Sequence, residues 1–185
     1  TTVEALIEEV KMAHDYLIKN QKEFQIDVNN IFVVGFSAGG HLAAAVANKY
    51  PKLFKKVVLS YPAVNITISD GMFEETEEVR FCRRMFEENL ILGVTKNNPP
   101  TFIWHTGEDP VVPIVESINY IHKLNELGVK FEAHFYEKGE HGISIGNRVV
   151  QYEDKNSGFN LHASSWVNLS ISWLLTWEYM LLVAA

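Results

Sequence analysis

Ser37 lies in a Gly-x-Ser-x-Gly pattern at residues 35–39. The residues that lead into it, 31–36, form a continuous apolar run that is typical of a strand buried on both faces, and a helical pattern follows. A sharp strand-to-helix turn exposes a serine hydroxyl as a nucleophile and aims the next amide, that of Ala38, at a developing oxyanion. The pattern alone is weak, because a tight turn or a phosphate-binding loop gives similar residues. Neither a Walker lysine nor a G-x-G-x-x-G spacing is present, however.

A carboxylate suited to orient a catalytic base follows a later strand. Of the five aspartates, only Asp109 comes just after a predicted strand, residues 101–106, that lies beyond the serine. Glu108 is its neighbouring rival, but Pro110 fixes the turn directly after Asp109 and favours the aspartate. The alternative for Asp109 is a carboxylate that only caps the following helix.

His141 is the predicted base among seven histidines. It lies in a glycine-containing loop, residues 138–142, after a predicted strand at 131–136. The alternative is a loop histidine without a catalytic role. The other six histidines fit other positions: His14 and His122 on helix surfaces, His105 and His134 packed within strands, His41 in a structural hydrogen bond beneath the serine, and His162 at the start of the last helix. Ser37, Asp109 and His141 therefore form a candidate nucleophile–acid–base triad, in the chain order of the α/β-hydrolase fold.

Strands that alternate with helices must position these three residues. The apolar periodicity predicts an α/β fold with a mostly parallel sheet flanked by helices, in one domain over residues 1–185 with a cap or insertion at 64–98. The predicted strands are 31–36, 57–61, 101–106 and 131–136. The predicted helices are 2–22, 41–49, 74–89, 114–127 with Gly128 as its cap, and 166–185.

Composition narrows the kind of substrate. The net charge of −7 gives no basic surface for nucleic acid or anionic membranes and favours a small neutral substrate over a polyanion. The apolar segment 166–185 carries polar residues and helical spacing, so we expect it to pack on the core and not to span a membrane. The single Cys82 excludes an internal disulfide and favours a reducing compartment such as the cytoplasm. We expect no metal, because the histidines lack ligand spacing, and no cofactor.

The motifs resemble the acetylxylan-esterase-like (BD-FAE-like) branch of the α/β hydrolases. The matching segments are 35–44, 99–113 and 131–142, and the likeness extends over about residues 1–145. The resemblance implies a serine esterase that removes short acyl groups, often acetyl, from carbohydrates such as acetylated xylan oligosaccharides. Prolyl-oligopeptidase-like serine peptidases share this layout, but their elbow usually carries Trp and Tyr where Phe36 and Ala38 stand here. A further alternative is an inactive remnant of the fold that serves as an interaction module.

The sequence differs from this family before the serine. The family places several strands there, with a His-Gly-Gly loop that gives a second oxyanion donor, whereas this chain has one helical segment. We therefore expect a sheet that lacks its N-terminal strands and leaves strand 31–36 at an edge, which is an aggregation hazard. A second copy of the chain or an N-terminal segment of a longer protein is expected to cover that strand.

Overall fold

The computed structural model describes residues 2–65, 74, 76–86, 88–151 and 158–179 of the chain. Its strands and helices alternate, as the sequence predicts. The strands are β1 (Phe32–Phe36), β2 (Lys56–Ser60), β3 (Thr101–Thr106) and β4 (Phe131–Tyr136). The helices are α1 (Val3–Lys19), α2 (Ala38–Lys49), α3 (Glu77–Met85), α4 (Val115–Glu126) and α5 (Trp166–Tyr179), with short 3-10 helices at Arg148–Val150 and Ala163–Ser165.

The described strands form one parallel sheet in the order β1-β2-β3-β4. Gly35 pairs with Leu59, Leu59 with Ile103, and Ile103 with Ala133, so the strands run in step across the sheet. In a parallel sheet the carboxyl ends of the strands share one edge, and ligands of open α/β sheets bind there. The segments that follow β1, β3 and β4 therefore start from the same edge, which confirms the predicted fold class.

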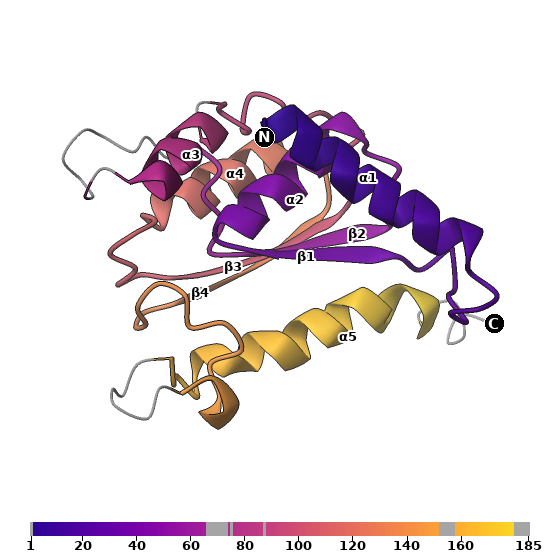
Figure 1. Ribbon diagram of the computed structural model, residues 1–185. Coiled ribbons are helices and arrows are strands. Elements are labelled where there is room, and N and C mark those ends of the chain that lie inside the picture. The colour runs from indigo at the N-terminus through magenta and orange to yellow at the C-terminus, as the bar shows by residue number, and fades with distance from the viewer. Residues whose placement is uncertain (1, 66–73, 75, 87, 152–157, 180–185) are drawn as a thin grey trace.

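Alternate strand residues enter two separate cores, because successive side chains of a strand point to opposite faces. Leu59 and Ile103 contribute to the core under α1, α2 and α4. Phe102 and Trp104 contribute to the core under α5, which covers the other face of the sheet (Figure 1). Both faces are thus covered by helices, and β2 and β3 are buried along their whole length.

Several predicted boundaries need correction. The helix predicted at 41–49 begins at Ala38, directly after Ser37. The strand predicted at 57–61 ends at Ser60, because Tyr61 has a left-handed φ of 39° that leaves the strand conformation. The first helix ends at Lys19, and α3 covers only part of the helix predicted at 74–89. Within the predicted insertion, residues 66–73, 75 and 87 lie outside the described residues.

Helix α5 packs on the sheet as expected. Trp166 and Trp173 are buried, and the buried Lys56 donates from Nζ to the carbonyl oxygens of Trp173 at 2.6 Å and Leu174 at 2.9 Å. The Lys56 ammonium also lies 4.6 Å from the centroid of the Trp173 ring, a cation–π distance. Among the described residues, no helix combines the length and the hydropathy that crossing a bilayer requires. Residues 180–185 of the predicted helix lie outside the described part.

Strand β1 lies at one edge of the sheet, as the sequence predicts. In the described part of the chain its strand partner is β2, and Val34 in its middle is 47% exposed. Within the described residues, the strand that leads into Ser37 therefore has a strand partner on one side only.

Candidate active site

Ser37 occupies a strained turn between β1 and α2. Its φ of 52° and ψ of −117° are outside the regions that non-glycine residues favour. Its amide donates to the carbonyl oxygen of Ser60 at 2.9 Å, so the turn is fastened to the end of the neighbouring strand β2. Such a conformation persists only where surrounding contacts hold it, and here the hydroxyl lies within hydrogen-bond distance of His141.

Two glycines make this turn sterically feasible. A Cβ atom on Gly35 would collide with the carbonyl oxygen of Gly39, and one on Gly40 would lie 2.8 Å from Cβ of Pro62. At Gly39 itself, an added Cβ would have no heavy atom within 4 Å. Close packing of the backbone therefore requires glycine at position 35 of the pattern and at position 40, just beyond it. Gly39, the last glycine of Gly-x-Ser-x-Gly, has room for a side chain.

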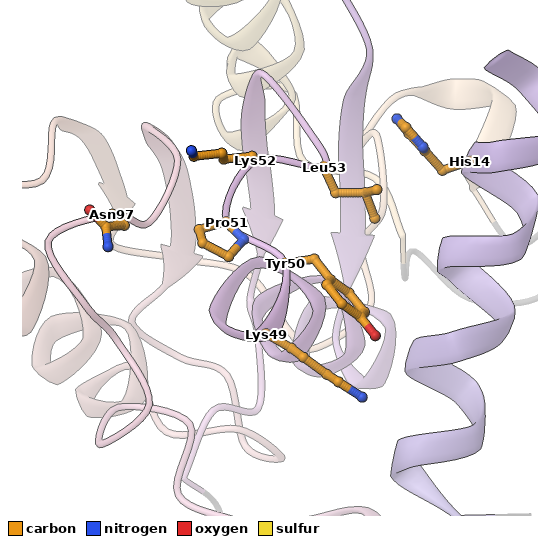
Figure 2. Close-up of a pocket in the computed structure, with 7 residues that line it drawn as sticks. All are labelled: His14, Lys49, Tyr50, Pro51, Lys52, Leu53 and Asn97. Carbon is orange, nitrogen blue, oxygen red and sulfur yellow. The ribbon is translucent and has the colours of Figure 1, made fainter.

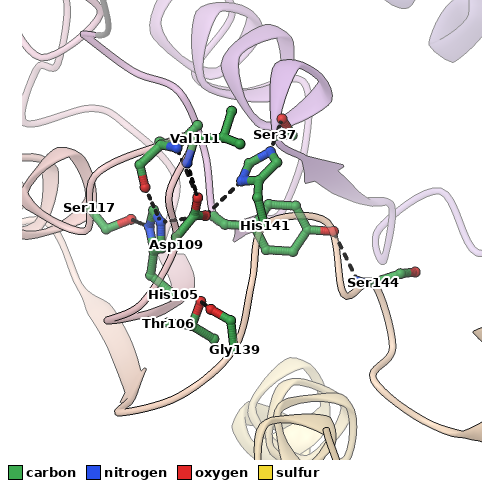
Figure 3. A network of polar contacts seen from close by, with 11 residues as sticks. Ser37, His105, Thr106, Asp109, Val111, Ser117, Gly139, His141 and Ser144 are labelled. Carbon is green, nitrogen blue, oxygen red and sulfur yellow. Dashed lines mark hydrogen bonds and ion pairs between the residues drawn. The ribbon is translucent and has the colours of Figure 1, made fainter. Parts of the chain in front are cut away.

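The structure brings the three predicted triad residues together (Figure 3). The Oγ atom of Ser37 lies 2.7 Å from Nε2 of His141, and Nδ1 of His141 lies 2.6 Å from Oδ2 of Asp109. An ionised carboxylate can only accept, so Nδ1 carries the ring proton. Nε2 is then left to accept the hydroxyl proton of Ser37, which is the arrangement that activates a serine.

Asp109 is held as an anion by a saturated set of donors. Its side chain is fully buried, and burial alone would raise its pKa. Hydrogen bonds from His105 and His141 to Oδ2, and from the amides of Val111 and Val112 to Oδ1, outweigh that cost and hold the pKa of Asp109 well below its usual range. Asp109 can therefore stabilise a positive charge on His141 without taking its proton. The rival Glu108 is exposed.

His105 was expected only to pack within its strand, but it contacts the carboxylate of Asp109. Its ring is fully buried, and Nε2 lies 3.2 Å from Oδ2 of Asp109 and 2.9 Å from the carbonyl oxygen of Val112. Both partners are acceptors, so Nε2 carries a proton; in the neutral ring, Nδ1 then accepts from the hydroxyl of Ser117 at 2.7 Å. The available signal was chemical: a histidine inside a predicted strand, four residues before the acid, needs hydrogen-bond partners if that strand is buried.

The remaining histidines make their ring contacts elsewhere. His41 is buried, with Nδ1 2.7 Å from the carbonyl oxygen of Ala63, as expected for a structural hydrogen bond. His134 bonds to Glu132 and stacks on a phenylalanine, His122 is exposed, and His162 precedes α5 with its ring against a tyrosine. His14, predicted at a solvated surface, is half-buried with its ring edge against Phe54.

Ala38 is the first residue of α2. The first amides of a helix lack intrahelical acceptors, and the helix dipole gives that end a partial positive charge. The predicted oxyanion donor thus comes from the residue next to the serine, at the end of α2 that favours an anion. Within the described residues, no cluster of three or more histidine, cysteine, aspartate or glutamate side chains is arranged to hold a metal ion.

An open groove lies at the opposite end of α2 from Ser37 (Figure 2). It is lined by Lys49, Tyr50 and Pro51 at the end of the helix, together with His14, Lys52, Leu53 and Asn97. This lining contains neither a hydroxyl of serine or threonine nor a carboxylate. It does not compete with the Ser37 site as a place for nucleophilic chemistry.

A parallel sheet flanked by helices, with a serine elbow at its carboxyl edge, defines the chain as an α/β hydrolase. Residues 4–164 match the prolyl oligopeptidase family, and the chain belongs to that family. Peptidases of this name were the expected alternative because they share the layout, whereas Phe36 and Ala38, where their elbow usually carries Trp and Tyr, favoured the esterases.

Two of the curated relatives carry xylan or acetylxylan in their names. The chain is 27% identical over 161 residues to endo-1,4-beta-xylanase B of Butyrivibrio fibrisolvens, covering 76% of this chain and 25% of that protein. It is 25% identical over 146 residues to an acetylxylan esterase of Xylanibacter ruminicola, covering 72% and 30%. The chain thus spans less than a third of either relative, and the second relative confirms the expected likeness to acetylxylan esterases.

A solved structure extends the likeness to the fold as a whole. A sugar hydrolase from Lactococcus lactis superposes with a TM-score of 0.81 at 34% identity, and the match covers 97% of this chain and 71% of that one. The described elements are therefore those of a hydrolase fold, of which this chain matches 71% in that protein.

Proposed function

We propose that this chain is a serine esterase that hydrolyses short-chain esters, acetyl esters above all, of carbohydrates such as acetylated xylan oligosaccharides. The observation that carries the proposal is the unbroken series of contacts from Ser37 Oγ through His141 to the buried Asp109, at 2.7 and 2.6 Å. Such a series is what an acyl transfer through an acyl-serine requires.

The first half of the reaction forms the acyl-serine. His141 Nε2 takes the hydroxyl proton as Ser37 Oγ attacks the ester carbonyl carbon, and Asp109 stabilises the imidazolium that results. The amide of Ala38 donates to the oxyanion of the tetrahedral intermediate, and one such donor contributes about 10²–10³ in rate. His141 then gives its proton to the leaving alcohol oxygen as the bond from that oxygen to the carbonyl carbon breaks.

The second half releases the acid. A water molecule attacks the acyl carbon while His141 Nε2 takes one of its protons, and the same proton returns to Ser37 Oγ as the acyl–oxygen bond breaks. The products are the free alcohol and the carboxylic acid, and the enzyme regains its starting protonation state. No redox step or cofactor enters this balance.

The substrate class rests on two supports. The net charge of −7 disfavours polyanionic substrates and suits a neutral acetylated sugar. The names of the relatives, an acetylxylan esterase and a sugar hydrolase, point to the same chemistry. The acetyl group, the carbohydrate and a cytoplasmic location, the last favoured by the single Cys82, are parts of this proposal.

The test compares the wild-type chain with Ser37→Ala on p-nitrophenyl acetate and on acetylated xylo-oligosaccharides, with acetate release as the readout. We expect hydrolysis of both by the wild type and a fall of more than roughly 10³ in kcat for the variant, with an unchanged melting temperature. Wild-type rates in the Ser37→Ala protein would contradict the assignment.

The alternatives give different outcomes in the same series of assays. A serine peptidase, which the family name suggests, would cleave a prolyl or aminoacyl amide faster than the acetyl ester. An inactive remnant would not react with a fluorophosphonate probe, whereas an assembled triad labels at Ser37. We expect labelling of the wild type, none of Ser37→Ala, and a preference for the ester.

A further inference from the structure

The loop that carries His141 has an unusual backbone. Gly139, Gly142 and Gly146 have left-handed φ values of 139°, 81° and 64°, and Ser144 has a φ of 52° without being a glycine. A non-glycine residue in this region costs about 1–3 kcal/mol and persists only where tertiary contacts impose it. The position of His141 therefore depends on what holds this loop from outside.

The two ends of the loop are fastened by hydrogen bonds from side chains and from the backbone. Thr106 Oγ1 donates to the carbonyl oxygen of Gly139 at 2.7 Å, and Asn160 Nδ2 donates to that of Lys138 at 2.7 Å. At the far end, the amide of Asn160 donates to the carbonyl oxygen of Gly146 at 2.8 Å. These bonds fix where the loop begins and ends but do not reach its middle.

The middle of the loop is held at Ser144, through both of its backbone polar groups. The amide of Ser144 donates to the hydroxyl oxygen of Tyr61 at 3.1 Å. The carbonyl oxygen of Ser144 accepts from Nε1 of Trp166 at 3.0 Å. Tyr61 follows β2 and Trp166 begins α5, so two distant elements hold the strained residue, three positions after His141.

Tyr61 also contacts the imidazole directly. Its ring centroid lies 5.0 Å from that of His141, in an edge-to-face arrangement. Tyr61 has a left-handed φ of 39°, and its amide donates to the carbonyl oxygen of Trp104 at 2.8 Å. Burial raises the pKa of Tyr61 to about 12, so its hydroxyl stays neutral at working pH. Two strained non-glycine residues, Tyr61 and Ser144, are thus joined by one hydrogen bond beside the proposed base.

We propose that Tyr61 and Trp166 are positioning residues, which clamp the backbone of Ser144 and thereby hold His141 at hydrogen-bond distance from Ser37. The inference rests on the proposed function. It adds to that function two aromatic residues that act through the loop and not on the substrate. A displacement of about 1 Å at a reacting group can cost about 10² in rate, so the clamp acts on kcat more than on KM.

The test removes one polar atom at a time. Tyr61→Phe keeps the ring against His141 and loses the acceptor for the Ser144 amide, and Trp166→Phe loses the indole donor. We expect each variant to lower kcat for p-nitrophenyl acetate about tenfold with KM changed less than about threefold. Independent losses would lower kcat about 100-fold in the double variant. We expect a smaller fall, because both side chains act on Ser144.

Matched controls come from the same aromatic cluster. Tyr136 is also buried, and its hydroxyl bonds to Ser165 Oγ at 3.1 Å. We expect Tyr136→Phe to keep kcat within about twofold of the wild type. Trp173→Phe, also in α5, controls for the volume lost in Trp166→Phe, and it should lower the melting temperature without the kcat effect.

A second readout separates this inference from the proposed function. The proton on His141 Nδ1, bonded to Asp109, should give a downfield proton NMR signal in the wild type. We expect it to broaden and to exchange faster with solvent in Tyr61→Phe, but not in Tyr136→Phe. If the wild type neither hydrolyses esters nor labels with fluorophosphonate, the proposed function fails. If it does both, and Tyr61→Phe and Trp166→Phe match their controls in kcat and in this signal, the clamp is overturned.

Discussion

Two polar networks in this protein each contain a contact of the same length but have different surroundings. One, the site network, runs from Ser37 through His141, Asp109 and His105 to Ser117. The other, the α1–α2 surface network, joins Lys49 and Tyr50 at the end of α2 to Glu4 and Glu8 of α1. Ser37 Oγ to His141 Nε2 and Lys49 Nζ to Glu8 Oε1 are both 2.7 Å, and both contacts join residues far apart in the chain.

Exposure separates the two networks. The side chains of Asp109 and His105 are 0% exposed, whereas those of Glu4 and Glu8 are 66% and 45% exposed. Water and salt can replace the partners of an exposed ion pair, so such pairs contribute little to stability. A buried acceptor has no such replacement, and the loss of one partner leaves its full desolvation cost. Burial, and not bond length, therefore decides which of these polar contacts fix the structure.

Asp109→Asn, which breaks the site network at its buried anion, should have the largest effect on activity. In Asp109→Asn the neutral amide no longer holds the proton on His141 Nδ1 or stabilises the imidazolium, and we expect kcat/KM for p-nitrophenyl acetate to fall roughly 10⁴-fold. The exposed neighbour supplies the control: Glu108→Gln removes a carboxylate one position away and should leave kcat/KM unchanged. Equal losses in both variants would show that the burial of Asp109 does not matter.

The contrast between the buried Asp109 and the exposed Glu108 should also appear in the free energy of unfolding at acid pH. Because the folded pKa of Asp109 is depressed, its stabilising contribution is fully present above its unfolded pKa of about 4, and it is lost as pH falls toward the folded value. Between pH 4 and pH 2, urea unfolding should show that the wild type loses roughly 2 kcal/mol more than Asp109→Asn. Glu108→Gln should follow the wild type. Parallel curves for all three proteins would contradict the prediction.

A smaller effect is expected at the far end of the site network. Ser117→Ala removes the hydroxyl that bonds to His105 Nδ1, which frees the ring that supports Asp109. We expect kcat to fall about tenfold, equivalent to about 1.4 kcal/mol, with KM little changed. Ser170→Ala is the matched control, because Ser170 is also buried in a helix but bonds only to the carbonyl oxygen of Val167 among the described contacts. A Ser117→Ala enzyme with the kinetics of Ser170→Ala would limit the network to Asp109 and His141.

The smallest effect belongs to the α1–α2 surface network. Lys49→Met removes the ammonium that pairs with Glu4 and Glu8, yet we expect only a slight fall in the melting temperature. In about 1 M NaCl, where the screening length is about 3 Å, even that difference from the wild type should vanish. Lys52→Met, at the same end of α2, controls for the loss of one charge. A large effect of Lys49→Met that persists in salt would remove the contrast between the networks.

The sequence predicted the fold through periodicity. The continuous apolar run at 31–36 predicts a strand, and the structure places β1 there; the strand predicted at 101–106 is β3. The ends of the helices and strands were harder to predict, because the start of α2 at Ala38 and the end of β2 before Tyr61 depend on strained backbone angles. No local pattern reports such angles, since tertiary contacts impose them.

The site was predictable where chain order and loop position carry the information. Ser37, Asp109 and His141 each follow a strand, and parallel strands bring such loops to one edge. His105 and Tyr61 were not predicted, because their roles depend on partners across the fold, Ser117 on α4 and Ser144 in the histidine loop. A histidine or tyrosine in a strand looks the same in sequence whether it packs or orients a catalytic group.

The ammonium of Lys56, bonded to the carbonyl oxygens of Trp173 and Leu174, bears on the order in which the chain can fold during synthesis. Lys56 leaves the ribosome more than a hundred residues before those partners. Until α5 emerges, the sheet face that carries Trp104 lacks its helical cover, and the ammonium of Lys56 lacks the carbonyl oxygens that it bonds to in α5. The nascent chain therefore completes its second core only with its last described helix, and a translational pause before residue 166 would lengthen the time during which chaperones must shield that face.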